Sequence, residues 1–371
     1  MNGLLLAPVF PKIPAKVRQE RNVMGLRVGF SGYGAAGRYL HAPLVAAAGM
    51  EVAAVVTSRG EEVAADFPGA AVLPDFGALL ARPDIDLVVI VTPNVLHVPQ
   101  VRAALEAGRH VVVDKPATPT RSEAEQLAAM AQERGLKLAV YHNRRWDSDF
   151  LTAKRLLESG ELGEIAALRL VWDRFRPQVL ERWRDRQAPA SGNLYDLGSH
   201  LIDQALQLVG MPDWLQADVF TQRQGGVTDD GFELLMGLGR MRLSLGVSLI
   251  AAAPRDRFRI EGTLGTFRKQ GLDVQEDQLK GGMAPLDPRF GLEPQTQWGE
   301  IVDPDGSRRP VPCERGRWLT FYEGMRQAIE TGAEVPVTMT SAARVIGLIE
   351  AAHASARLGR RMALDPDGRW A

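Results

Sequence analysis

The feature of this sequence that most constrains its fold is a glycine-rich turn after a short apolar segment. Residues 26–31 (LRVGFS) are mostly apolar, and Gly32, Gly34 and Gly37 follow with the spacing G-x-G-x-x-G. Gly32 can adopt the positive φ of a sharp turn, Gly34 lets a ligand approach the backbone, and Gly37 lets a strand and a helix pack closely. The spacing is typical of a strand, turn and helix that hold the pyrophosphate of a dinucleotide.

The segments around the turn decide between this interpretation and a glycine-rich turn without a ligand, because the chain has 37 glycines. The helix-compatible stretch AAGRYLHAPLVAAA follows, and residues 51–56 have the composition of a second strand. Together they form a βαβ unit of about the required length. We therefore expect Tyr33 and Ala35 to lie beside the cofactor with the three glycines.

Apolar and amphipathic segments alternate as far as residue 141. We expect strands at 85–91, 110–113 and 136–141, and helices at 97–107 and 122–134, with Ser122 as a helix N-cap. Such alternation predicts a Rossmann-type, doubly wound parallel sheet with helices on both faces. Ligands bind beyond the carboxyl ends of its strands. The cofactor contacts expected there are Thr92, Pro93, Asn94, His97, Asp114 and Lys115.

The pattern changes after Tyr141, where Arg, Asp and Trp crowd together in HNRRWDSDF and WDRFRPQVLERWRDR. Residues 241–249 alternate apolar with small or polar side chains, as in a strand with one face in the core. We predict a large, mostly antiparallel open sheet with further strands at 218–222, 232–236, 258–261 and 265–269. Residues 271–316 are expected to form a long surface excursion, and helices are expected at 319–330 and 341–358.

These patterns predict an N-terminal extension over residues 1–24, a dinucleotide-binding domain over 25–141 and a second α/β domain over 142–371. No apolar run approaches the ~20 residues that span a bilayer, and the apolar stretch at 4–10 lacks the basic start of a signal peptide. Cys313 is the single cysteine, so no internal disulfide can form, and a cytoplasmic protein is expected. The net charge of −1 gives no indication of a nucleic-acid partner.

The end of the second predicted strand indicates which dinucleotide binds. An NAD site normally has an acidic residue there for the ribose 2′-hydroxyl. This chain has Thr57, Ser58 and Arg59 instead, a set that suits a 2′-phosphate. The sequence therefore favours NADP over NAD. The alternative is that Arg59 is a solvated surface residue.

Lys115 and a later helix supply candidate catalytic groups. Lys115 follows a buried strand, so its ammonium group is expected beside the nicotinamide, where it would stabilise an alkoxide; the alternative is a solvated lysine. In SGNLYDLGSHLIDQALQLV, expected to be helical from about residue 193, Asp196 and His200 are neighbours at i and i+4. A carboxylate beside an imidazole suits a general base. An exposed polar helix face would have the same spacing.

The stretch from Arg144 to Arg186 combines ten Lys or Arg with eight Asp or Glu, and three tryptophans lie among them. Charged donors and acceptors beside aromatic faces suit a polyhydroxylated ring, although ion pairs between helices would explain the same composition. The six histidines show none of the spacings of a zinc site, so no metal is expected.

The combination of GYGAAG, the Thr-Pro-Asn of TPNVLH, DKPATPT and YDLGSH resembles the Gfo/Idh/MocA family of nicotinamide-dependent oxidoreductases from about Met24 onward. The family's usual Glu-Lys-Pro is Asp114-Lys115-Pro116 here. The resemblance implies that Lys115, Asp196 and His200 are the catalytic set, with His200 as the acid/base. It also implies substrate contacts from Asn143, Arg144, Trp146, Tyr195 and His200.

The segments VTSRGEEVAADFP, VYHNRRWDSDFLT and DRFRPQV resemble the subgroup that contains NADP-dependent scyllo-inositol dehydrogenase. This implies that a ring hydroxyl on a cyclitol or sugar is interconverted with a ketone. It also implies that the second domain mediates a homodimer or homotetramer. Two alternatives remain open: a family enzyme acting on another sugar, and a non-catalytic regulator that senses the cofactor.

Overall fold

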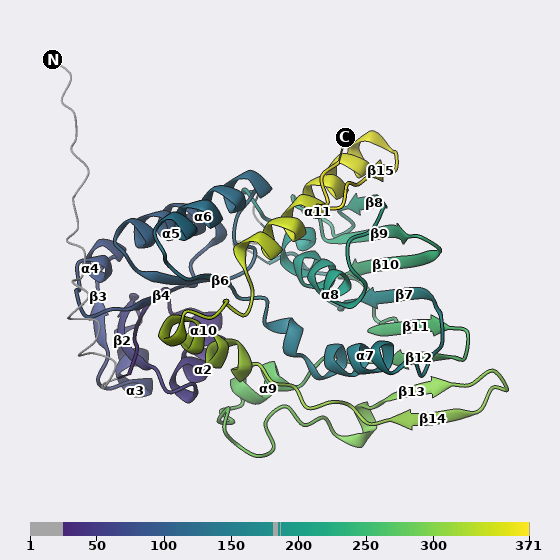
Figure 1. Cartoon of the computed structure of the whole chain (residues 1–371), viewed down its shortest axis with the longest axis horizontal. Helices are drawn as coiled ribbons and strands as arrows, with labels where there is room; N and C mark the ends of the chain where they lie inside the picture. Colours follow the sequence, from purple (N-terminus) through teal and green to yellow (C-terminus); the bar gives the residue numbers. More distant parts are fainter. Residues whose placement is uncertain (1–24, 181–184, 186, 371) are drawn as a thin grey trace.

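The computed structural model describes residues 25–180, 185 and 187–370. The predicted N-terminal extension, residues 1–24, lies outside the described residues. Figure 1 shows two halves side by side, each built around one sheet, with α11 (Met339–Leu358) reaching from one to the other.

The N-terminal half contains a six-stranded parallel sheet in the order β3-β2-β1-β4-β5-β6. This order confirms the predicted Rossmann-type sheet. The strands β2 and β3 are added on one side of β1, and β4, β5 and β6 are added on its other side. The strand β3 was not predicted because it is only three residues long. The strands are β1 (Arg27–Ser31), β2 (Glu51–Val56), β3 (Ala71–Leu73), β4 (Leu87–Ile90), β5 (His110–Val113) and β6 (Leu138–Val140).

Helices cover both faces of this sheet, with α5 and α6 on one side and α2 and α10 (Leu319–Thr331) on the other (Figure 1). The prediction that Ser122 caps α6 was wrong. Thr120 is the N-cap, and its side chain forms a reciprocal capping box with Glu123. The helices after β1 are η1 (Ala36–His41, a π-helix), α2 (Ala42–Ala47), α3 (Gly60–Asp66), α4 (Phe76–Leu80), η2 (Asn94–Leu96), α5 (His97–Glu106) and α6 (Arg121–Glu133).

The second half contains a nine-stranded sheet in the order β14-β13-β12-β11-β7-β10-β9-β8-β15. Its neighbours are antiparallel except for β7 and β10, which confirms the predicted mostly antiparallel sheet. The strands are β7 (Ile165–Val171), β8 (Trp214–Phe220), β9 (Gly231–Leu238), β10 (Met241–Ser248), β11 (Phe258–Gly262), β12 (Gly265–Lys269), β13 (Gly299–Val302), β14 (Arg308–Val311) and β15 (Met362–Ala363).

Helices pack on the face of this sheet that is turned toward the N-terminal half, and no helix of the described chain covers the opposite face (Figure 1). The alternation in β10 follows from this one-sided packing, since its inward residues Leu243, Leu245 and Val247 are buried. The covering elements are η3 (Asn143–Trp146), α7 (Ser148–Ser159), η5 (Leu194–Gly198), α8 (Ser199–Val209) and α11 (Met339–Leu358).

The prediction that residues 271–316 form a surface excursion was wrong. This segment contains α9 (Gln275–Lys280) and the short η6 (Gln295–Gln297), and β13 and β14 then extend the large sheet. Ile301 of β13 is fully buried against the core. The two strands are only four residues each, so the surrounding glycine, proline and charged residues concealed them.

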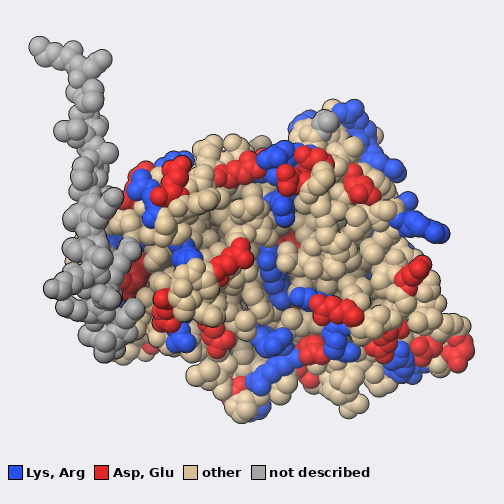
Figure 2. Space-filling view, viewed as in Figure 1, with Lys and Arg blue, Asp and Glu red and all other residues tan. Residues whose placement is uncertain are grey.

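The helix α10 (Leu319–Thr331) follows the large sheet in sequence but belongs to the core of the first half. Trp318, Phe321, Tyr322 and Met325 join the apolar cluster around β1, β2 and β4. The second half of the chain therefore completes the first. On the face drawn in Figure 2, acidic and basic side chains are interspersed. No helix among the described residues is long and apolar enough to cross a membrane.

Candidate active site

A cavity of about 480 Å³ lies between the carboxyl edge of the parallel sheet and the helices of the second half. Both halves contribute polar side chains to it, so a ligand bound at the sheet edge would face groups from the second domain. The residues that line it are Gly32, Gly34, Ala35, Ala36, Leu40, His41, Val91, Thr92, Pro93, Asn94, His97, Asp114, Lys115, Tyr141, Asn143, Arg144, Trp172, Arg174, Asp196, Leu197, His200 and Glu276.

Each of the three glycines of the turn has a different geometric role. Gly32 has φ +99°, and a Cβ there would lie 2.5 Å from the carbonyl oxygen of Val91. A Cβ on Gly37 would lie 2.7 Å from the Gly32 carbonyl oxygen. A Cβ on Gly34 would meet nothing within 4 Å and would project into open space beside the cavity. The turn therefore has the exposed backbone that a pyrophosphate needs.

Polar side chains fix the segment that follows β4 by contacting backbone carbonyl groups. The side-chain amide of Asn94 donates to the carbonyl of Ala190 at 2.8 Å. The two ring nitrogens of His97 lie 2.9 Å from the carbonyl oxygens of Pro116 and Thr92. Burial lowers the pKa of His97. His97 thus braces the two strand-end segments, while Thr92 and Pro93 line the cavity in front of it.

Lys115 connects the two halves. Its Nζ atom lies 2.6 Å from Oδ1 of Asp196 and 2.7 Å from the Asp196 carbonyl oxygen. Its backbone N–H donates to the Asp114 carboxylate at 2.8 Å. The Asp196 carboxylate, predicted as a neighbour of His200, also contacts Lys115 and so orients the lysine. A lysine fixed in this way presents its ammonium group at a defined point of the cavity.

His200 lies on α8 and faces the same cavity, with only 5% of its surface exposed. Its ring is 5.7 Å from that of Trp172, and its Nδ1 atom has no hydrogen-bond partner among the described residues. Burial, together with the charges of Lys115 and Arg144, holds the pKa of His200 well below its usual range. The imidazole is therefore neutral near pH 7 and able to accept a proton.

The helix around His200 does not have the solvated polar face of the alternative hypothesis. Asp203, which shares that face, is 1% exposed and receives two hydrogen bonds from Arg145 at 2.9 and 2.6 Å. A π-helical turn, η5, precedes α8 and carries Asp196. Pairing Asp203 with a cation avoids the cost of a buried, uncompensated carboxylate.

Arg144 forms the floor of the substrate side of the cavity. Its guanidinium lies 4.8 Å from the Trp172 ring and 4.9 Å from the Trp318 ring. An Nη atom donates to Glu276 at 2.5 Å. Burial alone would raise the pKa of Glu276, but Arg144 and Lys280 outweigh it and lower the pKa to about 2. This arginine is fixed by contacts with two tryptophan rings and by charge pairing with Glu276.

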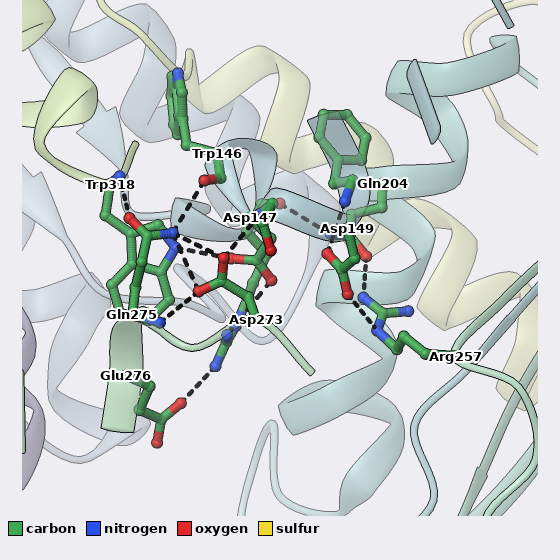
Figure 3. A network of polar contacts seen from close by, with 12 residues as sticks. Trp146, Asp147, Asp149, Gln204, Arg257, Asp273, Gln275, Glu276 and Trp318 are labelled. Atoms are coloured by element: carbon green, nitrogen blue, oxygen red, sulfur yellow. Dashed lines mark hydrogen bonds and ion pairs between the residues drawn. The ribbon is translucent and has the colours of Figure 1, made fainter. Parts of the chain in front are cut away.

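Figure 3 shows a network of polar contacts that includes Glu276, the partner of Arg144. The indole N–H of Trp318 donates to Asp147 at 2.7 Å, and Gln275 bonds to both Asp273 and the Trp146 carbonyl. Arg257 pairs with Asp149 at 3.3 Å farther along. These groups come from η3, α7, α9 and the start of α10, so the network fixes the elements that surround the substrate side.

Several predicted site residues lie away from this cavity. The hydroxyl of Tyr33 donates to Asp66 at 3.0 Å, the hydroxyl of Tyr195 donates to the Pro119 carbonyl at 2.8 Å, and Trp146 packs 6.0 Å from the Phe321 ring. The remaining predicted residues outside the cavity lining are Gly37 in the turn and, at the end of β2, Thr57, Ser58 and Arg59.

The structure also adds residues that the sequence did not single out. Trp172, Arg174 and Glu276 line the substrate side, and His41 and Tyr141 lie on the cofactor side with ring centroids 3.9 Å apart. Trp172 and Arg174 belong to the stretch rich in Arg and Trp, but the composition does not say which members face inward. Glu276 lies in the segment assigned to the surface, so no signal pointed to it.

Two family models match the chain. The oxidoreductase family model of an NAD-binding Rossmann fold matches residues 26–142, and the oxidoreductase family model of a C-terminal alpha/beta domain matches residues 154–364. The matched ranges coincide with the two sheets described above. The cavity lies between the two halves, and each half supplies one side of it.

Curated proteins and solved structures match almost the whole chain. The scyllo-inositol 2-dehydrogenase (NADP(+)) of Bacillus subtilis is 39% identical over 353 residues, which cover 94% of this chain and 99% of that protein. An uncharacterized oxidoreductase of Escherichia coli is 42% identical over 90% of this chain and 96% of its own. The structure of an oxidoreductase from Bacillus subtilis has a TM-score of 0.89 at 39% identity, with 92% and 98% of the two chains covered.

The comparisons and the geometry agree on a nicotinamide-dependent dehydrogenase that acts on CH–OH groups. The glycine turn, the lysine after β5 and the histidine on α8 are the features that gave the resemblance in the sequence. The chain belongs to the Gfo/Idh/MocA family of oxidoreductases.

Proposed function

We propose that this enzyme interconverts a ring hydroxyl and a ketone on a cyclitol or sugar with NADP, and that scyllo-inositol is a substrate. The observation that supports this most is the placement of Lys115 and His200, from different halves, in one cavity with the glycine turn. The relative that acts on scyllo-inositol with NADP shares 39% of its residues with this chain.

The proposed chemistry needs one proton acceptor and one group that stabilises negative charge. A bound nicotinamide would accept or supply the hydride. His200, neutral because it is buried among cations, takes the proton of the reacting hydroxyl. The ammonium of Lys115 stabilises the developing alkoxide, and Asp196 keeps that ammonium in place. In the reverse direction the same imidazole returns the proton.

The preference for NADP rests on the end of β2. Ser58 and Arg59 are exposed there, without the carboxylate that would bind a ribose 2′-hydroxyl. A second cation lies nearby, because Arg38 contacts Glu62 at 2.7 Å and Arg59 contacts the same carboxylate at 3.7 Å. Two guanidinium groups next to a free hydroxyl suit a 2′-phosphate.

The preference for a polyhydroxylated ring rests on the substrate side of the cavity. Asn143 and Arg144 offer hydrogen-bond donors, and Trp172 offers an aromatic face for C–H groups. A homodimer or homotetramer formed through the uncovered face of the large sheet is part of the same proposal, and light scattering of the purified chain would measure its size.

A spectrophotometric screen tests the function. Cyclitols, aldoses and keto sugars are supplied with NADP and, separately, with NAD, and the change in absorbance at the reduced nicotinamide band is followed. We expect scyllo-inositol to give the highest kcat/KM with NADP among these neutral compounds. Faster turnover of another sugar would favour the alternative of a different sugar dehydrogenase. Tight NADP binding with no turnover of any polyol would contradict the proposal.

A further inference from the structure

Arg174 is a cation of the cavity that the proposed chemistry does not use. It follows β7, and its backbone is fixed on both sides, since its N–H donates to the Ser248 carbonyl at 2.8 Å and its carbonyl accepts from Ala251 at 3.2 Å. Its guanidinium lies 5.2 Å from the Trp172 ring and lines the cavity. The side chain is therefore directed at the space in which the substrate would bind.

The other charged side chains of the cavity have partners. Lys115 pairs with Asp196 at 2.6 Å, and Arg144 pairs with Glu276 at 2.5 Å. Asp114 accepts the backbone N–H of Lys115 and lies 3.9 Å from Nε2 of His41. Within the part of the chain that the structure describes, no carboxylate lies within ion-pair distance of Arg174.

An unpaired cation in a partly desolvated position is costly. The cost is visible in the pKa of Arg174, which burial lowers to about 10; the charges of Arg176 and Arg144 add to this shift, and the more distant carboxylates of Asp196 and Glu276 only partly oppose it. Such a group becomes favourable when a ligand supplies the missing negative charge. Arg174 stacks on the same tryptophan as Arg144, and that tryptophan lies beside His200. The ligand is therefore the substrate rather than the pyrophosphate at the glycine turn.

We propose that Arg174 binds a carboxylate on the substrate, so that the enzyme accepts ring polyols with one acidic substituent, such as uronic acids, in preference to their neutral counterparts. This inference rests on the proposed function, because it concerns the same cavity and reaction. A carboxylate fits better than a phosphate for two reasons. It has the single charge that Arg174 lacks, and its two oxygens match the planar guanidinium fork.

Matched substrate pairs test the proposal with the intact enzyme and NADP. The kcat/KM values for glucuronate and glucose, and for galacturonate and galactose, are measured for wild type, Arg174→Gln and Arg174→Lys. The control is Arg176→Gln, because Arg176 is an exposed arginine two residues away that does not line the cavity. A charge-assisted hydrogen bond corresponds to a factor of about 10 to 100.

We expect wild type to prefer each acid by about tenfold or more. Arg174→Gln should reduce the acid-to-neutral ratio by at least about tenfold, Arg174→Lys should retain part of it, and Arg176→Gln should leave the ratio within about twofold. The wild-type ratio tests the proposal even where a variant fails to fold.

Two results would overturn the inference while the proposed function stands. One is equal or better turnover of the neutral sugars by wild type, and the other is an unchanged ratio in folded Arg174→Gln. A higher kcat/KM for inositol monophosphate than for either uronate would also overturn the assignment to a carboxylate. Failure of the proposed function is a different outcome, in which wild type reduces NADP neither with scyllo-inositol nor with any of these compounds.

Discussion

The two sides of the cavity are built in different ways. The cofactor side is built mainly from the segments that follow β1, β4 and β5, with Tyr141 after β6 as a further contributor. The substrate side consists of long charged and aromatic side chains that come from η3, β7, α8 and α9, and residues 144 and 276 meet there in an ion pair. The cofactor side therefore depends on local backbone shape, and the substrate side depends on charge pairing across the sequence.

The largest expected effect is a loss of kcat, caused by a substitution that alters the substrate side alone. His200→Ala removes the proposed proton acceptor and should lower kcat by about 10³-fold, within the range typical of a general base. NADP affinity should change by less than about threefold, because the glycine turn is untouched. Stopped-flow turnover and equilibrium titration with NADP measure the two quantities. His353→Ala, which alters a histidine on α11 outside the cavity, is the control. Turnover close to wild type would contradict the assigned base.

A smaller effect is expected when the cofactor side is altered by charge instead of shape. Arg59→Asp should reduce the ratio of kcat/KM with NADP to that with NAD by about 10- to 100-fold, because a charge-assisted bond to the 2′-phosphate is replaced by repulsion. The exposed Arg102 on α5 offers a matched control, Arg102→Asp. An unchanged ratio would remove Arg59 from the cofactor site and leave Arg38 as the candidate cation.

The smallest effect concerns stability where the two sides meet. Burial lowers the pKa of His142 from 6.5 to about 4. Between these values the unfolded chain binds a proton that the folded chain does not, so this residue reduces stability as the pH falls. From pH 6.5 to 5.5 the loss should be about 1 kcal/mol. His142→Asn should lose less stability than wild type over this interval in denaturant titrations, and equal losses would show that His142 is protonated while folded.

The sequence predicted many residues that line the cofactor side because their features are local, but it did not single out His41 or Tyr141. The glycine spacing, the position of Lys115 and the alternation of segments follow from a few consecutive residues, and the parallel sheet is confirmed. The substrate side was predicted in part. His200 and Arg144 came from the family resemblance, but Glu276 did not, because its partner lies 132 residues away. Trp146 and Tyr195 came from the same resemblance, but the indole of Trp146 packs near Phe321 and the hydroxyl of Tyr195 donates to the Pro119 carbonyl.

The same limit explains one of the two errors in the fold. The strands β13 and β14 pair only with each other and with β12, so each looks like a loop in isolation. Ser122 has the composition of an N-cap, but Thr120 has the matching glutamate three residues later at Glu123. The strands depend on partners that a local pattern does not include, whereas the capping box of Thr120 and Glu123 is itself a local pattern.

The position of α10 has a consequence for how the protein is made. Phe321 and Tyr322 are fully buried in the core of the first half, and Tyr322 lies 2.6 Å from Nδ1 of His41 beside the glycine turn. During synthesis on a ribosome, the last strand of the parallel sheet is made about 180 residues before the helix that covers it, since β6 ends at Val140 and α10 begins at Leu319. The nascent Rossmann unit is left with an uncovered apolar flank until translation is nearly finished. A helix made late in synthesis thus covers the core of the domain that is made first.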